Sequence, residues 1–422
     1  MRKPFAVAVA AALTLSVAAC SSSHNGSTGS NASRASEPAT IATGDGSGGT
    51  GPATGTPIKI GYANPSAGLY VIGGYDHGAD AAVKYVNSQL NGINGHPIEL
   101  VRCKTAIDST DPTAQACGQQ FANDPSIPFA MTGLLVDGAP FYAPLAAAGK
   151  PIFGGHPVSP QDFDAKGVYF FRGGVPTLSL GMGALAMALR PDAKQVNILY
   201  TDVATGQYGT KEVKAELGKG VNVKTIPVQP DATNVLPQAT ALTQDSPDAI
   251  VLVGIENICQ QVAQAFQTLR PSAPVISNSV CVNDTIAKNG GNIDGWYMSN
   301  YDVPADYAGS NSELSQFLSL YPKYASTPAT EDFAIDGWSE VLTLRTILSS
   351  VHGALTSANV TTALKDFKGP VTLGPVKVSC PGPAHYSAVC ALDSPAFVFV
   401  WKQGKYYPAL PNGTYTVDVA TS

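Results

Sequence analysis

The sequence contains few charged residues, and its main part lacks the motifs typical of catalytic centres. Asp, Glu, Lys and Arg make up 13% of the 422 residues, whereas about 25% is usual in soluble domains. The net charge is −6 at pH 7, so no basic excess favours nucleic acid as a partner. Beyond residue 56 we find no nucleophile elbow, zinc-protease helix, Walker loop or dinucleotide fingerprint. We therefore expect no cofactor and no enzyme, although a secreted hydrolase stays open, because a spatial triad needs no sequence motif.

Long hydrophobic runs are also scarce, and the one at the N-terminus is too short to span a bilayer. Arg2 and Lys3 precede an uncharged apolar run over residues 5–19, which is followed at once by Cys20 and three serines. A membrane-spanning helix needs about 20 apolar residues. Residues 1–19 are therefore predicted to be a secretory signal peptide.

Val17-Ala18-Ala19-Cys20 resembles the lipobox of bacterial lipoproteins. This resemblance implies that the Cys20 thiol carries a lipid, which would hold the exported protein at the outer face of the cytoplasmic membrane. An ordinary signal peptidase site before a cysteine is the alternative. Residues 20–56 consist mostly of Ser, Gly, Thr, Ala and Asn and cannot bury a core. We expect them to form a disordered tether, with the lipid as the only membrane contact.

The cysteines indicate disulfide bonds rather than a metal site. The chain has 7 cysteines, and setting Cys20 aside leaves an even number in a chain predicted to be exported. Zinc is the competing use, but the sequence has no Cys-x-x-Cys pair and no histidine at ligand spacing. The order of the remaining cysteines along the chain groups them into local pairs. The predicted disulfides are Cys103–Cys117, Cys259–Cys281 and Cys380–Cys390.

Beyond the tether, short apolar runs alternate with stretches of helical periodicity. This alternation predicts an α/β fold with parallel sheets that are covered by helices on both faces. In such sheets, ligands bind at the carboxyl ends of the strands. The predicted strands cover residues 58–63, 97–104, 129–133, 150–154, 196–202, 221–228, 249–254 and 274–278.

Several segments, in their order and spacing, resemble the leucine/isoleucine/valine-binding proteins and their amide-binding relatives. The segments that carry the resemblance are Ile58-Lys59-Ile60-Gly61, Gly78-Ala79-Asp80-Ala81-Ala82-Val83, Asn91-Gly92-Ile93-Asn94-Gly95, Asp111-Pro112, Tyr169-Phe170-Phe171-Arg172, Gln207-Tyr208-Gly209 and Gly374-Pro375-Val376. They extend over nearly all of residues 57–422. The resemblance implies the type I periplasmic binding fold, in which two α/β lobes are joined by three hinge crossings.

The resemblance also implies that each lobe is built from two separate parts of the chain. We place the crossings near residues 172–176, 300–304 and 369–375, where Pro or Gly suits a short hinge segment. The expected parts are 57–174 and 303–373 for the N-terminal lobe, and 175–302 and 374–422 for the C-terminal lobe.

The expected ligand site departs from the family pattern for amino acids. In amino-acid-binding members, a hydroxyl-rich loop after the third strand holds the ligand carboxylate, but this chain has Asp137-Gly138-Ala139 there. The acidic residue expected to hold the ligand ammonium is missing near Ser279, and Glu256 is the nearest substitute. The ligand is therefore expected to be neutral, polyhydroxylated, amide-like or cationic rather than a simple α-amino acid.

Other candidates come from loops that follow predicted strands. Tyr208 lies in the family-like Gln207-Tyr208-Gly209 and offers an apolar face with one hydroxyl, although it could instead pack on its own lobe. Asp137 could equally cap a helix, and His156 could be an ordinary buried polar group. The candidate ligand-binding residues are Asp137, Gly138, Ala139, His156, Tyr208, Glu256, Asn257 and Ser279.

The resemblance implies a function in solute capture. The chain is expected to be a monomeric, extracytoplasmic binding protein that takes up a small polar organic molecule and delivers it to the permease subunits of an ABC-type importer. A ligand-binding component of a membrane sensor is the alternative, because the sequence does not distinguish delivery to a permease from delivery to a receptor.

Overall fold

The computed structural model describes residues 40–41, 49–66, 71–106, 112–392, 395–411 and 413–415. The predicted signal peptide, Cys20 and Asp111 lie outside these residues. Within the described residues, no helix combines the length and the apolar character that crossing a membrane requires.

The first sheet is parallel throughout, and its described strands follow the order β3-β2-β4-β5-β6. The first four strands confirm predicted ones, and β6 was not among the predicted strands. The strands are β2 (Ile58–Pro65), β3 (Ile98–Thr105), β4 (Ala130–Thr132), β5 (Ile152–Gly154) and β6 (Val168–Phe170). The helices that alternate with them are α1 (Gly73–Gln89), α2 (Thr113–Asn123), α3 (Ala139–Ala147) and α4 (Pro160–Phe163).

Strand β2 shows why this sheet is covered on both faces. Ile58, Ile60 and Tyr62 pack into the core that α1 shares with α11 (Ala334–Ser349). Ala63 faces the opposite core, beneath α2 and α3. Side chains alternate along a strand, so the consecutive buried residues from Ile60 to Ala63 show that both faces of β2 are covered.

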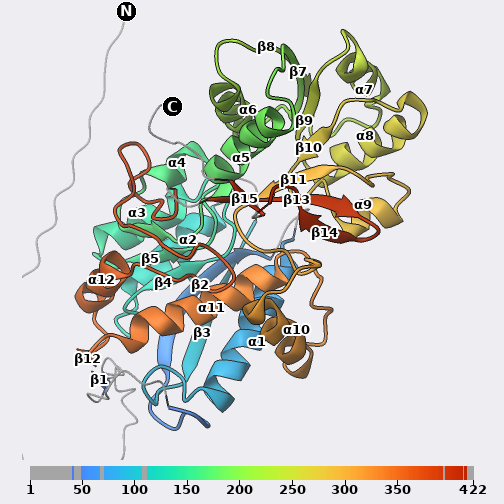
Figure 1. Cartoon of the computed structure of the whole chain (residues 1–422). Helices are drawn as coiled ribbons and strands as arrows, with labels where there is room; N and C mark the ends of the chain where they lie inside the picture. Colours follow the sequence, from blue (N-terminus) through green and yellow to red (C-terminus); the bar gives the residue numbers. More distant parts are fainter. Residues whose placement is uncertain are drawn as a thin grey trace, which may run out of the picture. The chain divides into compact units, whose positions relative to one another are not determined.

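Helices α1 and α11 lie side by side, although they are distant in sequence (Figure 1). Glycines allow this approach. A Cβ atom added at Gly78 would lie 2.0 Å from the carbonyl oxygen of Ala334, and one at Gly337 would lie 2.1 Å from that of Tyr75. Any larger residue at Gly78 or Gly337 would therefore force the two helices apart.

The second sheet contains parallel strands in the order β11-β10-β9-β7-β8 and continues antiparallel into β13, which pairs with β14 and β15. Its strands are β7 (Gln195–Thr201), β8 (Asn222–Val228), β9 (Ala249–Val253), β10 (Val275–Ser277), β11 (Tyr297–Asn300), β13 (Ala396–Lys402), β14 (Lys405–Pro408) and β15 (Thr414–Tyr415). Its helices are α5 (Gly174–Leu189), α6 (Ala204–Leu217), α7 (Leu236–Thr243), α8 (Glu256–Leu269) and α9 (Asp284–Lys288). Helices α5 and α6 cover one face of this sheet, and α7 and α8 cover the other (Figure 1).

The chain returns to the first lobe after β11. This segment contains α10 (Ser312–Leu320), a 3-10 turn (Tyr321–Lys323), α11, and α12 (Ser357–Asp366). A two-residue strand, β12 (Gly353–Ala354), pairs with β1 (Thr40–Ile41). Two parallel-sheet α/β lobes therefore form, as the sequence predicts.

The segment that follows residue 374 was expected to belong to the C-terminal lobe, but part of it packs in the first lobe. Val378, Cys380, Cys390 and Ala391 belong to the core of the first lobe. The chain reaches the second sheet only at β13. The expected assignment of residues 374–422 to the C-terminal lobe therefore does not fit these four residues, whose side chains are buried with those of the first lobe.

All three predicted disulfides are confirmed. The structure contains Cys103–Cys117, Cys259–Cys281 and Cys380–Cys390. Cys103 lies on β3 and Cys117 on the following α2, so this bond ties a strand to its own crossover helix.

One buried guanidinium joins the segments that run between the lobes. Arg172 follows β6 and is 2% exposed. One of its amino groups donates to Asp302, which follows β11, and the other donates to Ser339 on α11 and, at 3.5 Å, to the carbonyl oxygen of Thr372. Asn300 donates to the second carboxylate oxygen of Asp302 at 2.9 Å. Arg172 therefore lies in the first predicted crossing and binds Asp302 in the second. Its contact with Thr372 is made within the first lobe, because the chain passes to the second sheet only before β13 and not near residues 369–375 as expected.

Candidate functional site

A cavity of about 750 Å³ lies at the carboxyl ends of strands from both sheets. Its walls come from the loops after β4, β5, β7, β9, β10 and β11 and from the first turns of α5, α6 and α8. Most of the lining side chains are apolar, and we call this space the apolar cavity. The apolar residues are Ile72, Leu134, Val136, Val158, Val175, Leu178, Val203, Val253, Ile255, Val280, Tyr301 and Phe333. A volume of this size suits a small organic ligand.

Four of the predicted site residues line the apolar cavity: Asp137, His156, Glu256 and Ser279. Asp137 has a left-handed backbone with φ 52° and lies one residue before Gly138, which occupies the N-cap of α3. The carboxylate of Asp137 therefore does not cap that helix. Glu256 begins α8, where the positive end of the helix dipole favours a carboxylate.

The other four predicted site residues do not line this cavity. Gly138 and Ala139 form the start of α3, and Asn257 donates to the carbonyl oxygen of Pro230 at 3.0 Å. The Tyr208 hydroxyl lies 2.7 Å from that of Tyr386. Tyr208 was predicted to face the ligand, but its ring packs against Phe163 and Tyr386 in an apolar cluster that does not line the cavity.

Sequence reasoning missed Tyr301, Asp332 and Phe333, all of which line the apolar cavity. Tyr301 directly follows β11, so it would have been found had that strand been predicted. Asp332 and Phe333 precede α11, and Phe333 has a left-handed backbone with φ 64°. No strand precedes these two residues, and no local motif marks them.

His156 connects the cavity wall to the buried polar groups behind it. Its Nε2 lies 3.2 Å from Oδ1 of Asp336, and its ring packs on Tyr301 with centroids 4.2 Å apart. Burial lowers the pKa of His156, so the imidazole is neutral at neutral pH. The pKa of Asp336 is held below its usual range, because the contact with His156 and the charge of Arg172 outweigh the effect of burial.

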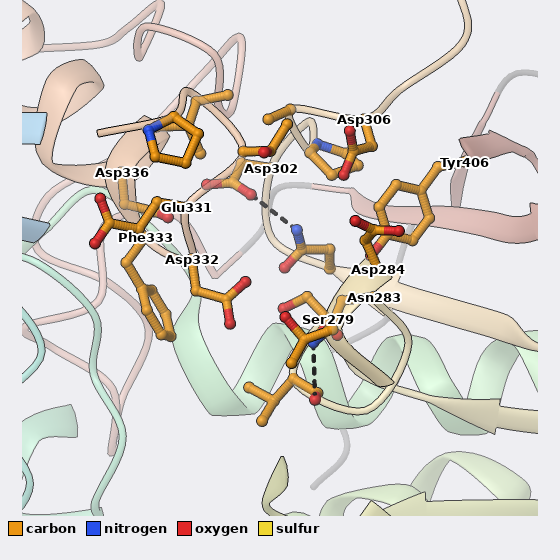
Figure 2. Close-up of a pocket in the computed structure, with 18 of the residues that line it drawn as sticks. Ser279, Asn283, Asp284, Asp302, Asp306, Glu331, Asp332, Phe333, Asp336 and Tyr406 are labelled. Atoms are coloured by element: carbon orange, nitrogen blue, oxygen red, sulfur yellow. Dashed lines mark hydrogen bonds between the residues drawn. The ribbon is translucent and has the colours of Figure 1, made fainter. Parts of the chain in front are cut away.

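Asp332 is the most perturbed carboxylate of the cavity wall. Desolvation by the surrounding protein raises the pKa of Asp332 to about 6, and the nearby carboxylates of Glu256 and Asp336 add to the rise. No ion pair to Asp332 occurs among the described residues. Figure 2 shows its carboxylate pointing across the space toward Ser279 and Asn283.

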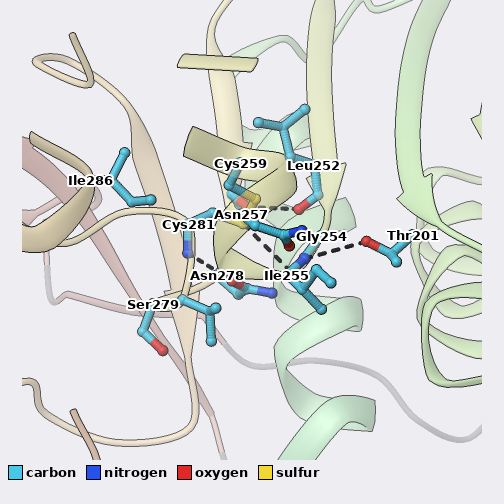
Figure 3. The surroundings of a disulfide bond; sticks show 12 residues. Thr201, Leu252, Gly254, Ile255, Asn257, Cys259, Asn278, Ser279, Cys281 and Ile286 are labelled. Carbon is cyan, nitrogen blue, oxygen red and sulfur yellow. Dashed lines mark hydrogen bonds between the residues drawn. A yellow bond between two sulfur atoms is a disulfide. The ribbon is translucent and has the colours of Figure 1, made fainter. Parts of the chain in front are cut away.

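The Cys259–Cys281 disulfide joins two segments that carry lining residues of the apolar cavity, among them Gly254, Ile255 and Ser279 (Figure 3). Cys259 lies in the first turns of α8, and Cys281 follows the cavity residue Ser279. The backbone N–H of Cys281 donates to Oδ1 of Asn278 at 3.2 Å. The bond therefore links the first turn of α8 to the loop after β10, both of which carry lining residues.

The described residues offer no cluster of three or more His, Cys, Asp or Glu side chains able to hold a metal ion. The site therefore consists of apolar walls, a few hydrogen-bonding groups and carboxylates. Such an arrangement can enclose a small molecule and orient its polar end.

The profile of a family described as periplasmic binding protein matches residues 57–402. No curated protein matches the chain significantly.

Several solved structures share the fold. A solute-binding protein of an ABC transporter from R. palustris, in complex with 4-hydroxybenzoate, is 15% identical with a TM-score of 0.69, covering 86% of this chain and 97% of that chain. A fatty acid ABC transporter substrate-binding protein from Thermomonospora curvata is 14% identical with a TM-score of 0.67, and the match covers 90% of this chain and 100% of that chain. A branched-chain amino acid transporter substrate-binding protein from Streptococcus pneumoniae, in complex with isoleucine, is 19% identical with a TM-score of 0.64. The match covers 83% of this chain and 98% of that chain.

Proposed function

Because the chain belongs to the periplasmic binding protein family, we propose that it captures a small organic molecule between its lobes and delivers it to an ABC-type importer. The observation that carries this proposal is the apolar cavity, whose walls come from both lobes at the carboxyl ends of their strands. A ligand that contacts both lobes binds the closed arrangement better, and only such a difference in affinity can drive closure.

The proposal includes a capturing rather than a catalytic role. Solved relatives from R. palustris and Streptococcus pneumoniae hold their ligands as binding proteins of transporters. We assign residues 57–174 and 303–391 to the lobe of the first sheet, with Arg172 at the hinge.

Filling the apolar cavity should abolish capture. Val203 lines the cavity just before α6 and is 37% exposed, so Val203→Trp can add bulk to the cavity without disturbing the core. We expect its affinity for the solute that co-purifies with the protein, identified by mass spectrometry, to fall at least about tenfold in calorimetry, or roughly 1.4 kcal/mol.

Leu236→Trp is the matched control, because Leu236 is 51% exposed on α7 and does not line the apolar cavity. It should bind like the natural protein. Equal affinity of Val203→Trp and the natural protein would contradict the assigned site, and chemical conversion of the bound solute would contradict a capturing role.

We also propose that a lipid on Cys20 holds the protein at the outer face of the cytoplasmic membrane. The support is Val17-Ala18-Ala19-Cys20 at the end of the predicted signal peptide. Cells fed a labelled fatty acid should incorporate the label into the natural protein and not into Cys20→Ser. Label retained by Cys20→Ser would show that the anchor lies elsewhere or does not exist.

A further inference from the structure

The apolar cavity adjoins a second cavity of about 550 Å³. Both are lined by Ser279, Val280, Tyr301, Asp332 and Phe333, so the two spaces meet at these residues. Figure 2 shows the second space, into which carboxylates from several segments converge. We call it the acidic cavity. A molecule longer than the apolar cavity could therefore place one end in each.

The acidic cavity carries a strong excess of negative charge. Its acidic lining residues are Asp284, Asp302, Asp306, Glu331, Asp332 and Asp336. Lys288 is the one basic residue among its described lining residues, and its ammonium is already paired with Asp284. The apolar cavity adds Asp137 and Glu256, and its described lining includes neither Lys nor Arg.

Two buried polar groups of the linings have no hydrogen-bond partner among the described residues, and the one in the acidic cavity is an acceptor that a donating ligand would satisfy. Oδ1 of Asn300, a residue of the acidic cavity that is 4% exposed, has no hydrogen-bond partner among the described residues. The amide nitrogen of Asn300 is already used by Asp302. The hydroxyl of Ser179, a fully buried residue of the apolar cavity, is also without a partner. Unsatisfied buried polar atoms are costly and call for an explanation.

Aromatic rings lie where the two cavities meet. Tyr301 and Phe333 line both spaces, and aromatic faces attract organic cations in addition to binding apolar groups. Asp332 lies beside Phe333 in Figure 2. The junction therefore combines a carboxylate that has no ion pair with two rings.

Resting on the proposed function, we propose that the ligand is an organic ammonium ion whose apolar body fills the apolar cavity and whose charged nitrogen lies at Asp332, at the entrance to the acidic cavity. Among the described basic residues of the two linings, an anionic ligand would meet only Lys288, which is already paired with Asp284, and it would face several carboxylates. The uncharged part of the ligand gains from the apolar walls, and the ammonium gains from Asp332, Tyr301 and Phe333.

The elevated pKa of Asp332 supports this placement. The carboxylates of Glu256, Asp336, Glu331 and Asp306 face it from the surrounding segments, and all of them add to the desolvation that raises its pKa to about 6. A bound ammonium compensates this accumulated negative charge. Binding of the cation should therefore favour the ionised form of Asp332.

Three probes that share a 4-phenylbutyl body test the inference: 4-phenylbutylamine, 4-phenylbutan-1-ol and 5-phenylpentanoate. Calorimetry on the exported chain at pH 7.5 should show the amine binding at least tenfold more tightly than the alcohol, and the carboxylate binding most weakly. Asp332→Asn should reduce the affinity for the amine to about that for the alcohol, while leaving the affinity for the alcohol unchanged. Asp192→Asn, which removes an exposed carboxylate far along the chain from both linings, should change neither.

Each other outcome overturns the inference. Equal or tighter binding of the carboxylate, equal losses of amine and alcohol in Asp332→Asn, or binding of none of the three probes contradicts an ammonium ligand. The proposed function is decided separately by the solute that co-purifies with the protein. If that solute is an anion that compacts the protein in X-ray scattering, solute capture stands and the ammonium inference fails.

Discussion

Replacing Arg172 with methionine is expected to lower the free energy of unfolding by about 3–5 kcal/mol, the usual cost of removing one partner of a buried ion pair. Arg172 is 2% exposed and donates to Asp302, Ser339 and Thr372. Methionine fills a similar volume but leaves the carboxylate of Asp302 buried without its partner. Urea denaturation measures the difference.

Two further variants separate the charge effect from the loss of packing. Arg172→Met combined with Asp302→Asn removes both charges, so it should recover part of the lost stability, as a double-mutant cycle would show. Arg190→Met removes an exposed arginine at the end of α5 and should change stability by less than about 0.5 kcal/mol. A loss below about 1 kcal/mol in Arg172→Met would show that the guanidinium does not hold the crossings together.

Replacing Glu340 with glutamine is expected to make the stability of the protein less dependent on pH. Glu340 is buried on α11 and accepts a hydrogen bond from the hydroxyl of Tyr75. Burial raises the pKa of Glu340 from 4.5 to about 8, even though Arg172 and the hydrogen bond from Tyr75 oppose the rise. The folded protein therefore retains a proton on Glu340 that the unfolded chain releases above pH 4.5.

The direction in which the stability changes with pH follows from this difference in proton binding. Between about pH 4.5 and 8 the folded state binds more protons, so the stability that Glu340 contributes is fully present below pH 4.5 and is lost as the pH rises to about 8. One pKa unit corresponds to about 1.4 kcal/mol. From pH 5 to pH 8, the stability of Glu340→Gln relative to the natural protein should therefore rise by about 2–4 kcal/mol.

The experiment relies on how the stability difference between the variant and the natural protein changes with pH. The amide of the variant does not titrate, so its own effect on stability is the same at every pH. Chemical denaturation at several pH values provides the data. Glu99→Gln, at an exposed position of β3, controls for the loss of one negative charge. Parallel stability curves for Glu340→Gln and the natural protein would contradict a protonated Glu340.

Much of the fold followed from local patterns, because strands of parallel sheets are continuous apolar runs. Residues 196–202 and 249–254, predicted as strands, correspond to β7 (Gln195–Thr201) and β9 (Ala249–Val253). The short β6 and the antiparallel β13 were not predicted. Strand β6 is only three residues long, and the pairing of β13 depends on a distant segment, as in the antiparallel register of Met298 with Phe399.

Only part of the candidate site could be predicted from the rule that ligands bind at the carboxyl ends of parallel strands. It led to Asp137, His156, Glu256 and Ser279, which line the apolar cavity. It failed for Tyr208, because a partner 178 positions away, Tyr386, holds the hydroxyl. Local sequence cannot show such a partner.

The apolar character of the cavity was also hidden in the sequence. Val136, Val203, Ile255 and Val280 lie in the segments that follow strands, where polar side chains are the expected ligand contacts. An isolated valine in a loop carries no signal of its own. Only the convergence of several loops turns such residues into a wall.

The pairing of α1 with α11 has a consequence for biosynthesis. Tyr75 on α1 and Glu340 on α11 are hydrogen-bonded although they are 265 positions apart in sequence, and the entire parallel part of the second sheet is translated between them. Contacts of such separation form slowly, because a long loop must close first. A nascent chain cannot complete its first lobe until α11 has been made. The first lobe is thereby kept from folding early, while most of the chain is still being made.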